Sequence, residues 1–98
     1  MLYAVFFEDD PAFSEMRMRL MPQPLDFLER NAERICAAGP LRNAADGSSA
    51  GGLWLVEAPD RASVVALYEN DPFWPTGLRR KVTVCEWSQV FADGRRLR

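Results

Sequence analysis

Asp71, which precedes Pro72, is the candidate for acid–base chemistry in a chain that contains no histidine. Imidazole is the side chain whose ordinary pKa lies nearest neutral pH, so its absence removes the usual proton carrier. A carboxyl group that points into a pocket between sheets would lose water, and its pKa would rise into a useful range. The alternative is structural, because Asp followed by Pro favours the start of a helical turn, here at Phe73 and Trp74.

Basic and aromatic side chains supply the candidate binding groups. Arg17 and Arg19 could hold an anionic ligand, since a guanidinium group binds carboxylate or phosphate through two parallel hydrogen bonds. The alternative is a solvated surface. Five aromatic residues could line a pocket, although such residues more often belong to the core; they are Tyr3, Trp54, Phe73, Trp74 and Trp87. Trp74 is the best pocket candidate because it lies in a loop between prolines.

Charge and cysteine content argue against several classes of partner. The net charge is −2 and the isoelectric point is about 5.1, so nucleic acid is not expected as a partner. We interpret 79–81 and 95–96 as a solvated turn and a solvated tail, and Glu8-Asp9-Asp10 as a solvated strand end rather than a metal site. Cys36 and Cys85 lack the spacing of metal ligands, so we expect buried free thiols, as in a reducing cytosol. We expect no metal and no cofactor.

The first eight residues have no basic leader and turn acidic after a short apolar run. This pattern predicts neither a signal peptide nor a membrane span, so we expect a cytoplasmic protein without a membrane partner. The length favours a single domain, which we place at residues 1–92, followed by a charged tail at 93–98 with little reason to be ordered.

The pattern along the chain predicts strand, helix, strand, strand, helix, strand. Strong strands are expected at 2–7, 53–56 and 82–87, and a weak edge strand within 41–52. Leu25, Leu28, Ala32, Ile35 and Cys36 recur at helical spacing, which predicts a helix that ends at Gly39-Pro40. A second helix should begin at Pro59-Asp60, end near Asn70, and turn Ala62, Val65, Ala66 and Glu69 toward the sheet.

These six elements predict an α+β, ferredoxin-like βαββαβ fold with a four-stranded antiparallel sheet and both helices on one face. The strong strands are apolar on both faces, so the face opposite the helices needs a cover. A second copy of the chain is the economical supplier, and we expect a homodimer that packs sheet to sheet into an α/β barrel, with higher assembly left open. Such a barrel commonly leaves a pocket for a small ligand.

Several segments, in this order, resemble the YCII-related (YciI-like) proteins of the dimeric α/β-barrel superfamily. They are Met1-Leu2-Tyr3, Arg17, Ala38-Gly39-Pro40-Leu41, Gly52-Leu53, Asn70-Asp71-Pro72-Phe73, Gly77-Leu78 and Trp87. The resemblance covers nearly the whole chain. It implies a dimeric ferredoxin-like fold and a proposed catalytic pair formed by a histidine and the Asp of the Asp-Pro-Phe turn. Characterised relatives include a dehydrochlorinase that acts on a chlorinated hydroxyquinol.

The aspartate of that pair carries over as Asp71, whereas the histidine position falls on Pro24. Proline has no titratable group, so the family's chemistry cannot run here as written. We therefore expect a protein that binds a small aromatic or anionic metabolite between its sheets, with Tyr3, Arg17, Pro24, Phe73 and Trp74 at the site. The alternative is a diverged lyase or hydrolase that uses Asp71 as acid or base, with Tyr3 or an arginine in place of histidine.

Overall fold

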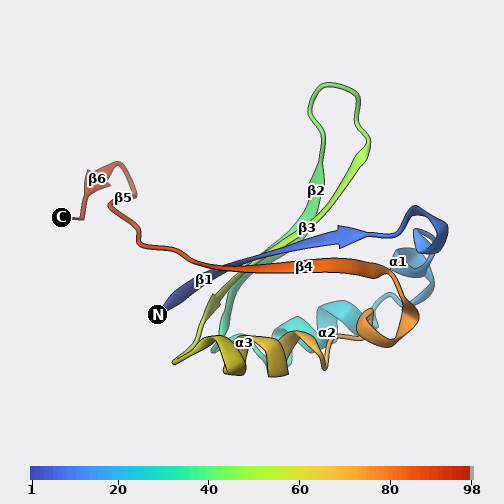
Figure 1. Cartoon of the computed structure of the whole chain (residues 1–98), viewed down its shortest axis with the longest axis horizontal. Coiled ribbons are helices and arrows are strands. Elements are labelled where there is room, and N and C mark those ends of the chain that lie inside the picture. The colour runs from blue at the N-terminus through green and yellow to red at the C-terminus, as the bar shows by residue number, and fades with distance from the viewer. Residues whose placement is uncertain (98) are drawn as a thin grey trace.

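The computed structural model describes residues 1–97 and shows an α+β fold with a four-stranded antiparallel sheet (Figure 1). The strands lie in the order β2-β3-β1-β4, with bounds β1 Leu2–Asp9, β2 Ile35–Arg42, β3 Ser49–Glu57 and β4 Arg79–Glu86. The helices are α1 Met16–Arg19, α2 Gln23–Arg30 and α3 Arg61–Tyr68, and two 3-10 turns occupy Pro11–Phe13 and Trp74–Thr76. The predicted fold class is confirmed.

The core lies between the sheet and the helices α2 and α3. Alternate residues of a strand point to opposite faces, and those that face the helices are buried. Phe7 of β1 packs edge-on against Trp54 of β3, with 5.0 Å between the ring centroids, and Phe27 of α2 lies 6.0 Å from Trp54. The other buried core residues are Tyr3, Val5, Ile35, Val56, Ala58, Val64, Leu67 and Tyr68.

Helix α3 begins as predicted but buries a different stripe. The Asp60 side chain accepts a hydrogen bond from the backbone N–H of Ser63 at 2.8 Å and so caps the helix. The buried residues are Val64, Leu67 and Tyr68, whereas Ala62, Ala66 and Glu69 are exposed and Val65 is half-buried. The predicted stripe was wrong by two positions, because turning the larger side chains inward removes more apolar surface from water.

The first long helix is shorter than predicted. Helix α2 ends at Arg30, where the Asn31 side chain donates to the Phe27 carbonyl at 2.8 Å. The predicted extension to Cys36 is wrong, since Ile35 already pairs with Val56 as the first residue of β2. Gly39-Pro40 therefore lies inside an edge strand instead of ending a helix. Proline is tolerated there because an edge strand does not need every backbone N–H.

Two further expectations differ from the structure. Cys36 and Cys85 are free but exposed rather than buried, because Cys36 lies on the edge strand and Cys85 faces away from the helices. The charged tail forms a small two-stranded sheet in which β5 (Phe91–Ala92) pairs with β6 (Arg95–Arg96). Asp93 and Gly94 take positive φ values at its turn, a conformation that Asp-Gly pairs favour. This hairpin crosses the expected boundary at residue 92.

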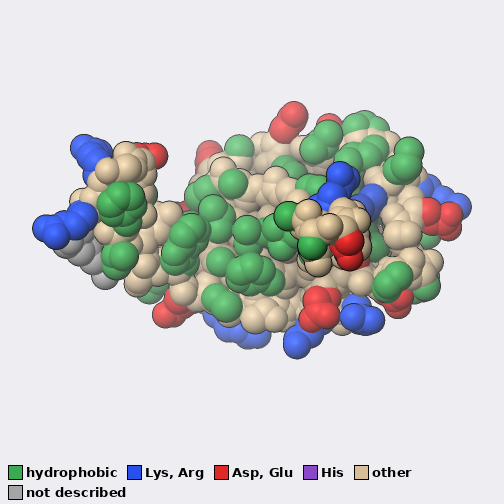
Figure 2. Space-filling model, turned by 90° about the horizontal axis from the view of Figure 1, so that it is seen from above, with side chains coloured by type: hydrophobic (Ala, Val, Ile, Leu, Met, Phe, Trp, Pro, Cys, Tyr) green, Lys and Arg blue, Asp and Glu red, His purple; other side chains and the backbone are tan. Residues whose placement is uncertain are grey.

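The sheet face opposite the helices carries apolar side chains (Figure 2). We call this surface the open face; its residues are Ala4, Phe6, Leu53, Leu55, Cys85 and Trp87. Phe6 is 44% exposed and Trp87 is 42% exposed. These values are high for large aromatic residues in a small domain. The prediction that helices cover only one face of the sheet is confirmed.

Candidate ligand-binding site

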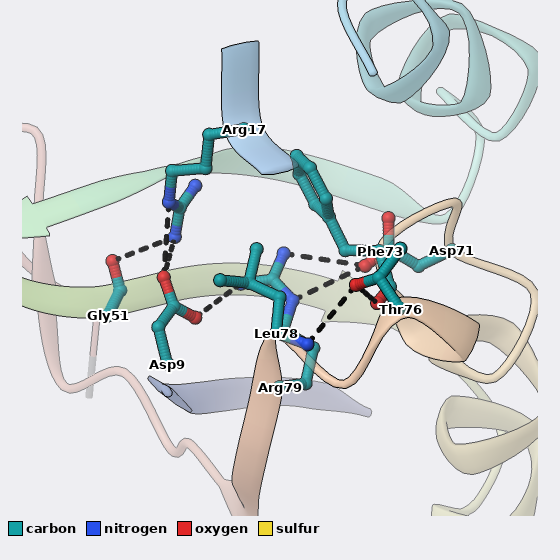
Figure 3. Close-up of polar contacts among 8 residues, drawn as sticks. All are labelled: Asp9, Arg17, Gly51, Asp71, Phe73, Thr76, Leu78 and Arg79. Atoms are coloured by element: carbon teal, nitrogen blue, oxygen red, sulfur yellow. Dashed lines mark hydrogen bonds and ion pairs between the residues drawn. The ribbon is translucent and has the colours of Figure 1, made fainter. Parts of the chain in front are cut away.

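Four charged side chains from separate parts of the chain meet at one end of the sheet (Figure 3). We call them the charged cluster: Asp9 at the end of β1, Arg17 in α1, Asp71 in the loop after α3, and Arg79 at the start of β4. The pairing of β1 with β4 shifts between Glu8 and Asp9, and this irregularity sets Asp9 opposite Arg79. Such irregularities re-aim side chains at strand ends.

Arg79 lies at the centre of the cluster. Its side chain is only 4% exposed, and its Nη1 donates to Asp9 Oδ1 at 3.2 Å. Its Nε and Nη2 both donate to Asp71 Oδ2 at 3.4 Å. The guanidinium carbon lies 4.2 Å from the centroid of the Phe7 ring and 5.1 Å from that of Phe73. Two carboxylates and two aromatic faces therefore compensate for the burial of this cation.

Arg17 approaches the cluster from the other side and is partly exposed. Its Nε donates to Asp9 Oδ2 at 3.1 Å, and its Nη2 contacts the same oxygen and the Gly51 carbonyl. No hydrogen bond to another described residue engages Nη1 of Arg17. The guanidinium carbon lies 5.6 Å from the centroid of the Phe73 ring. Arg17 thus holds a spare donor for an anionic ligand.

Asp71 is buried, with 2% of its surface exposed. Burial raises the pKa of its carboxyl group, while the positive charge of Arg79 and, more weakly, that of Arg17 act in the opposite direction. Its carboxylate bonds to Arg79, and no side-chain cap begins the turn at Trp74. A hydrogen bond from the Phe73 backbone N–H also lowers the pKa of this carboxyl, so Asp71 contributes both to the start of the turn and to the ion pair with Arg79.

The loop that carries Asp71 is held by its own hydrogen bonds. The backbone N–H of Asp71 donates to the Tyr68 carbonyl at 3.0 Å, and the N–H of Trp74 donates to the Asp71 carbonyl at 2.9 Å. The Thr76 hydroxyl donates to the Phe73 carbonyl at 2.6 Å and accepts from the N–H of Leu78 at 3.1 Å. These bonds fix the loop between α3 and β4, and with it the Asp71 carboxylate.

Two glycines in β3 allow close packing at the charged cluster, Gly51 against the backbone of β1 and Gly52 beside the arginines. Gly51 has φ +87°, and a Cβ atom at this position would lie 1.8 Å from the Phe7 carbonyl oxygen. At Gly52, a Cβ atom would lie 3.3 Å from Nη1 of Arg79 and 3.8 Å from Nη2 of Arg17. The absence of side chains here lets the cluster pack directly on the strand backbone.

A small cavity of about 130 Å³ adjoins the cluster. Arg17, Asp71 and Arg79 line it on one side, and most of the remaining wall is apolar. That wall comprises Met21, Pro24, Leu25, Leu28, Ala38, Gly39, Pro40, Gly52 and Phe73. Cavities that combine apolar walls with a few convergent polar groups are typical of small-molecule sites.

A wider hollow of about 650 Å³ lies on the other side of Arg17. Its lining includes Glu8, Asp9, Ser14, Gly51 and Arg80, and Arg17 lines both this hollow and the small cavity. Arg17 therefore stands where the two spaces approach each other, and its 27% exposure reflects that position.

The structure brings some of the predicted site residues together and separates others. Asp71, Arg17, Pro24 and Phe73 all line the small cavity, whereas Tyr3 and Trp74 do not. Tyr3 lies in the core toward the opposite end of β1 from Asp9, and the Trp74 ring packs against Tyr68 with 5.1 Å between centroids. Arg19 is exposed and pairs with Glu15 on the surface.

Sequence reasoning missed Asp9 and Arg79. Both belong to charged runs that we interpreted as solvated, yet their side chains are only 9% and 4% exposed. A usable signal was present, because β1 and β4 are neighbours in the predicted sheet and run antiparallel. The acidic end of β1 must then lie beside the basic start of β4, where opposite charges can pair.

Within residues 1–97, no helix is long and apolar enough to cross a membrane. The same residues contain no group of three or more His, Cys, Asp or Glu side chains that could hold a metal ion.

Comparison with known proteins gives one family and a structural neighbour. A family model described as the YCII-related domain matches residues 1–88. The fold is similar to a 5-chloro-2-hydroxyhydroquinone dehydrochlorinase (TftG) from Burkholderia phenoliruptrix AC1100, solved in complex with 2,5-dihydroxybenzoquinone. The TM-score is 0.78 with 28% sequence identity, and the match covers 90% of this chain and 94% of the neighbour. A search of curated proteins finds no significant match.

Proposed function

The chain belongs to the YCII-related family, and from this premise we propose that it binds a small aromatic or anionic metabolite in the cavity beside Asp71. The observation that carries the proposal is the shared cavity of Arg17, Asp71 and Pro24. Proline at the expected histidine position supplies an apolar wall and no proton, so the site favours binding over the family's proposed acid–base pair.

The size and chemistry of the cavity support a ligand of one ring. Its volume of about 130 Å³ is close to that of an engineered cavity of ~150 Å³ that holds benzene. Phe73 and the apolar wall can contact the faces of a planar ring, while Arg17 can donate to an oxygen at its edge. The ligand named for the neighbour, 2,5-dihydroxybenzoquinone, is a ring of this size that carries oxygen atoms.

We test this proposal by calorimetry with 2,5-dihydroxybenzoquinone as the probe. Arg17→Gln should weaken binding by about 10- to 100-fold, since a hydrogen bond to a charged group contributes roughly 1.5–3 kcal/mol. Arg19→Gln is the matched control, because Arg19 lies on the surface and pairs only with Glu15. Equal affinity in the wild type and Arg17→Gln would rule out Arg17 as the anion-binding group. No binding of this probe or of other small phenolates and carboxylates would overturn the proposed function.

The second candidate is a diverged lyase or hydrolase that uses Asp71 as acid or base. The raised pKa of this buried carboxyl favours it, since a carboxyl that holds its proton to higher pH can both donate and accept. Incubation with 5-chloro-2-hydroxyhydroquinone distinguishes the two functions. Binding alone predicts no chloride release, whereas the enzymatic alternative predicts release that Asp71→Asn abolishes and Arg19→Gln leaves intact.

We also propose that the protein works as a homodimer in the cytoplasm, with a second copy covering the open face. The exposed apolar side chains of that face support the pairing, and the two free cysteines suit a reducing compartment. Higher assembly is compatible with the same pairing.

A further inference from the structure

The C-terminal hairpin, formed by β5 and β6, stands away from the rest of the subunit (Figures 1 and 2). It lies beyond residue 88, where the match to the family model ends. Three apolar residues on and beside it are largely exposed: Val90 and Phe91 at 60% each, and Leu97 at 49%. A hydrogen bond from the Leu97 N–H to the Val90 carbonyl closes the hairpin at 2.9 Å. A projecting segment with exposed apolar residues is typical of an interaction site.

The hairpin and the domain carry opposite charge. Residues 89–98 contain three arginines and one aspartate, whereas residues 1–88 contain nine Lys and Arg against thirteen Asp and Glu. A basic, apolar segment is therefore complementary to the acidic domain of another copy of the same chain. The same segment cannot serve its own domain in this arrangement, because it points away from it.

The hairpin also lies on the side that the proposed dimer uses. In Figure 1 the helices α2 and α3 lie below the sheet, while the C-terminal hairpin and the tip of the β2–β3 hairpin both lie above it. The segment leaves β4 through Trp87, itself part of the open face. A second copy seated on the open face would therefore lie between these two projections.

The C-terminal hairpin would enlarge the contact made by the open face. Four strands of eight or nine residues, about 4.8 Å apart with about 3.3 Å per residue, give a footprint of roughly 500 Å². A stable dimer buries about 800 Å² of each partner. The exposed aromatic and aliphatic residues of the projecting hairpin would add to the accessible surface that the sheet face buries in such a dimer.

We propose that the C-terminal hairpin is a clasp that packs on a second copy of the chain and strengthens the sheet-to-sheet dimer. The inference rests on the pairing proposed above. Phe91 and Leu97 supply the apolar contact, and Arg95 and Arg96 pair with acidic groups of the other copy. An anionic membrane is the less suitable partner, because it would also repel the acidic domain that carries the hairpin.

The experiment is a dilution series in the analytical ultracentrifuge on full-length chains. Phe91→Ser with Leu97→Ser should raise the dimer dissociation constant at least about tenfold, as expected when a buried aromatic anchor is lost. Arg95→Glu with Arg96→Glu should weaken the dimer most at low salt. Met18→Ser and Arg19→Glu are matched controls at exposed sites on the short helix α1 and should leave the constant unchanged.

The outcomes separate the clasp from the rest of the proposal. An unchanged dissociation constant in both double variants overturns the clasp and leaves the dimer standing. A full-length chain that stays monomeric at micromolar concentration overturns both. Cosedimentation of the wild type with anionic vesicles, lost in the double variants while dimerisation is unaffected, overturns the clasp in favour of a lipid surface. Calorimetry with 2,5-dihydroxybenzoquinone reports independently on the small cavity, which contains no residue of the hairpin.

Discussion

Burial ties the protonation of Asp71 to folding. Because burial raises the pKa of this carboxyl group, the folded protein holds the proton at pH values where the unfolded chain has released it. The contribution of Asp71 to the free energy of unfolding is therefore fully present below the unfolded-state pKa. It is lost as pH rises through the higher pKa of the folded state.

Asp71→Asn removes this titration. We expect the free energy of unfolding of the wild type, minus that of Asp71→Asn, to decrease as pH rises from about 4 and then to level off. Denaturant titrations at a series of pH values measure this difference. An increase with pH would contradict the prediction and would mean that the ion pair with Arg79 outweighs burial.

Gly51 tests the packing under the charged cluster. Gly51→Ala would force a Cβ atom against the Phe7 carbonyl in addition to straining a backbone with positive φ, so we expect a loss of about 3 kcal/mol or more. Gly47→Ala is the matched control, because Gly47 also has a positive φ but open space around it. It should cost only about 1 kcal/mol. If Gly51→Ala and Gly47→Ala lose equal stability in thermal or denaturant unfolding, the backbone must shift so that the new Cβ atom avoids the Phe7 carbonyl.

At the residue scale, the site was only partly predictable from the sequence. Asp71, Arg17, Pro24 and Phe73 were identified, and all four line one cavity. Arg79 was not, because a run of basic residues is usually solvated, and local sequence does not reveal that two carboxylates from distant segments converge on one member of the run. Tyr3 was expected at the site on residue type alone, yet its place on β1 puts it in the core.

At the element scale, the order of strands and helices followed from hydrophobic periodicity, whereas boundaries did not. Ile35 fits both a helical stripe and a strand, and the choice is made by its pairing with Val56, a contact between residues far apart in the chain. The start of α3 was predictable because Asp60 is a local cap. The buried face of α3 was not predictable, since the sequence offers two apolar stripes on this helix.

Adjacent valines in α3 test which stripe is buried. Val64 is fully buried and Val65 is half-buried, so Val64→Ala should cost about 2 kcal/mol and Val65→Ala clearly less. Both substitutions remove the same two methyl groups and raise helix propensity alike, which makes each the control of the other. Denaturant unfolding measures the pair. A larger loss of unfolding free energy for Val65→Ala than for Val64→Ala would support the buried stripe predicted from the sequence.

For the whole molecule, the open face is the feature that a single subunit leaves unexplained. Phe6→Lys places a charge in the middle of this face, and we expect the dimer to dissociate because an unpaired charge would be buried in the interface. The subunit should fold normally, since Phe6 already faces solvent there. Light scattering coupled to size exclusion measures the mass, with Met18→Lys as the control at an 85% exposed position. An unchanged mass for Phe6→Lys would place the interface elsewhere.

Arg79 connects β1, β4 and the loop after α3 through Asp9 and Asp71, at the rim of the cavity. The same cation that gives the cavity its polarity therefore also holds an outer strand to its neighbour. Selection for a stable subunit is then sufficient to preserve a charged pocket over many generations, whether or not a reaction still takes place in it.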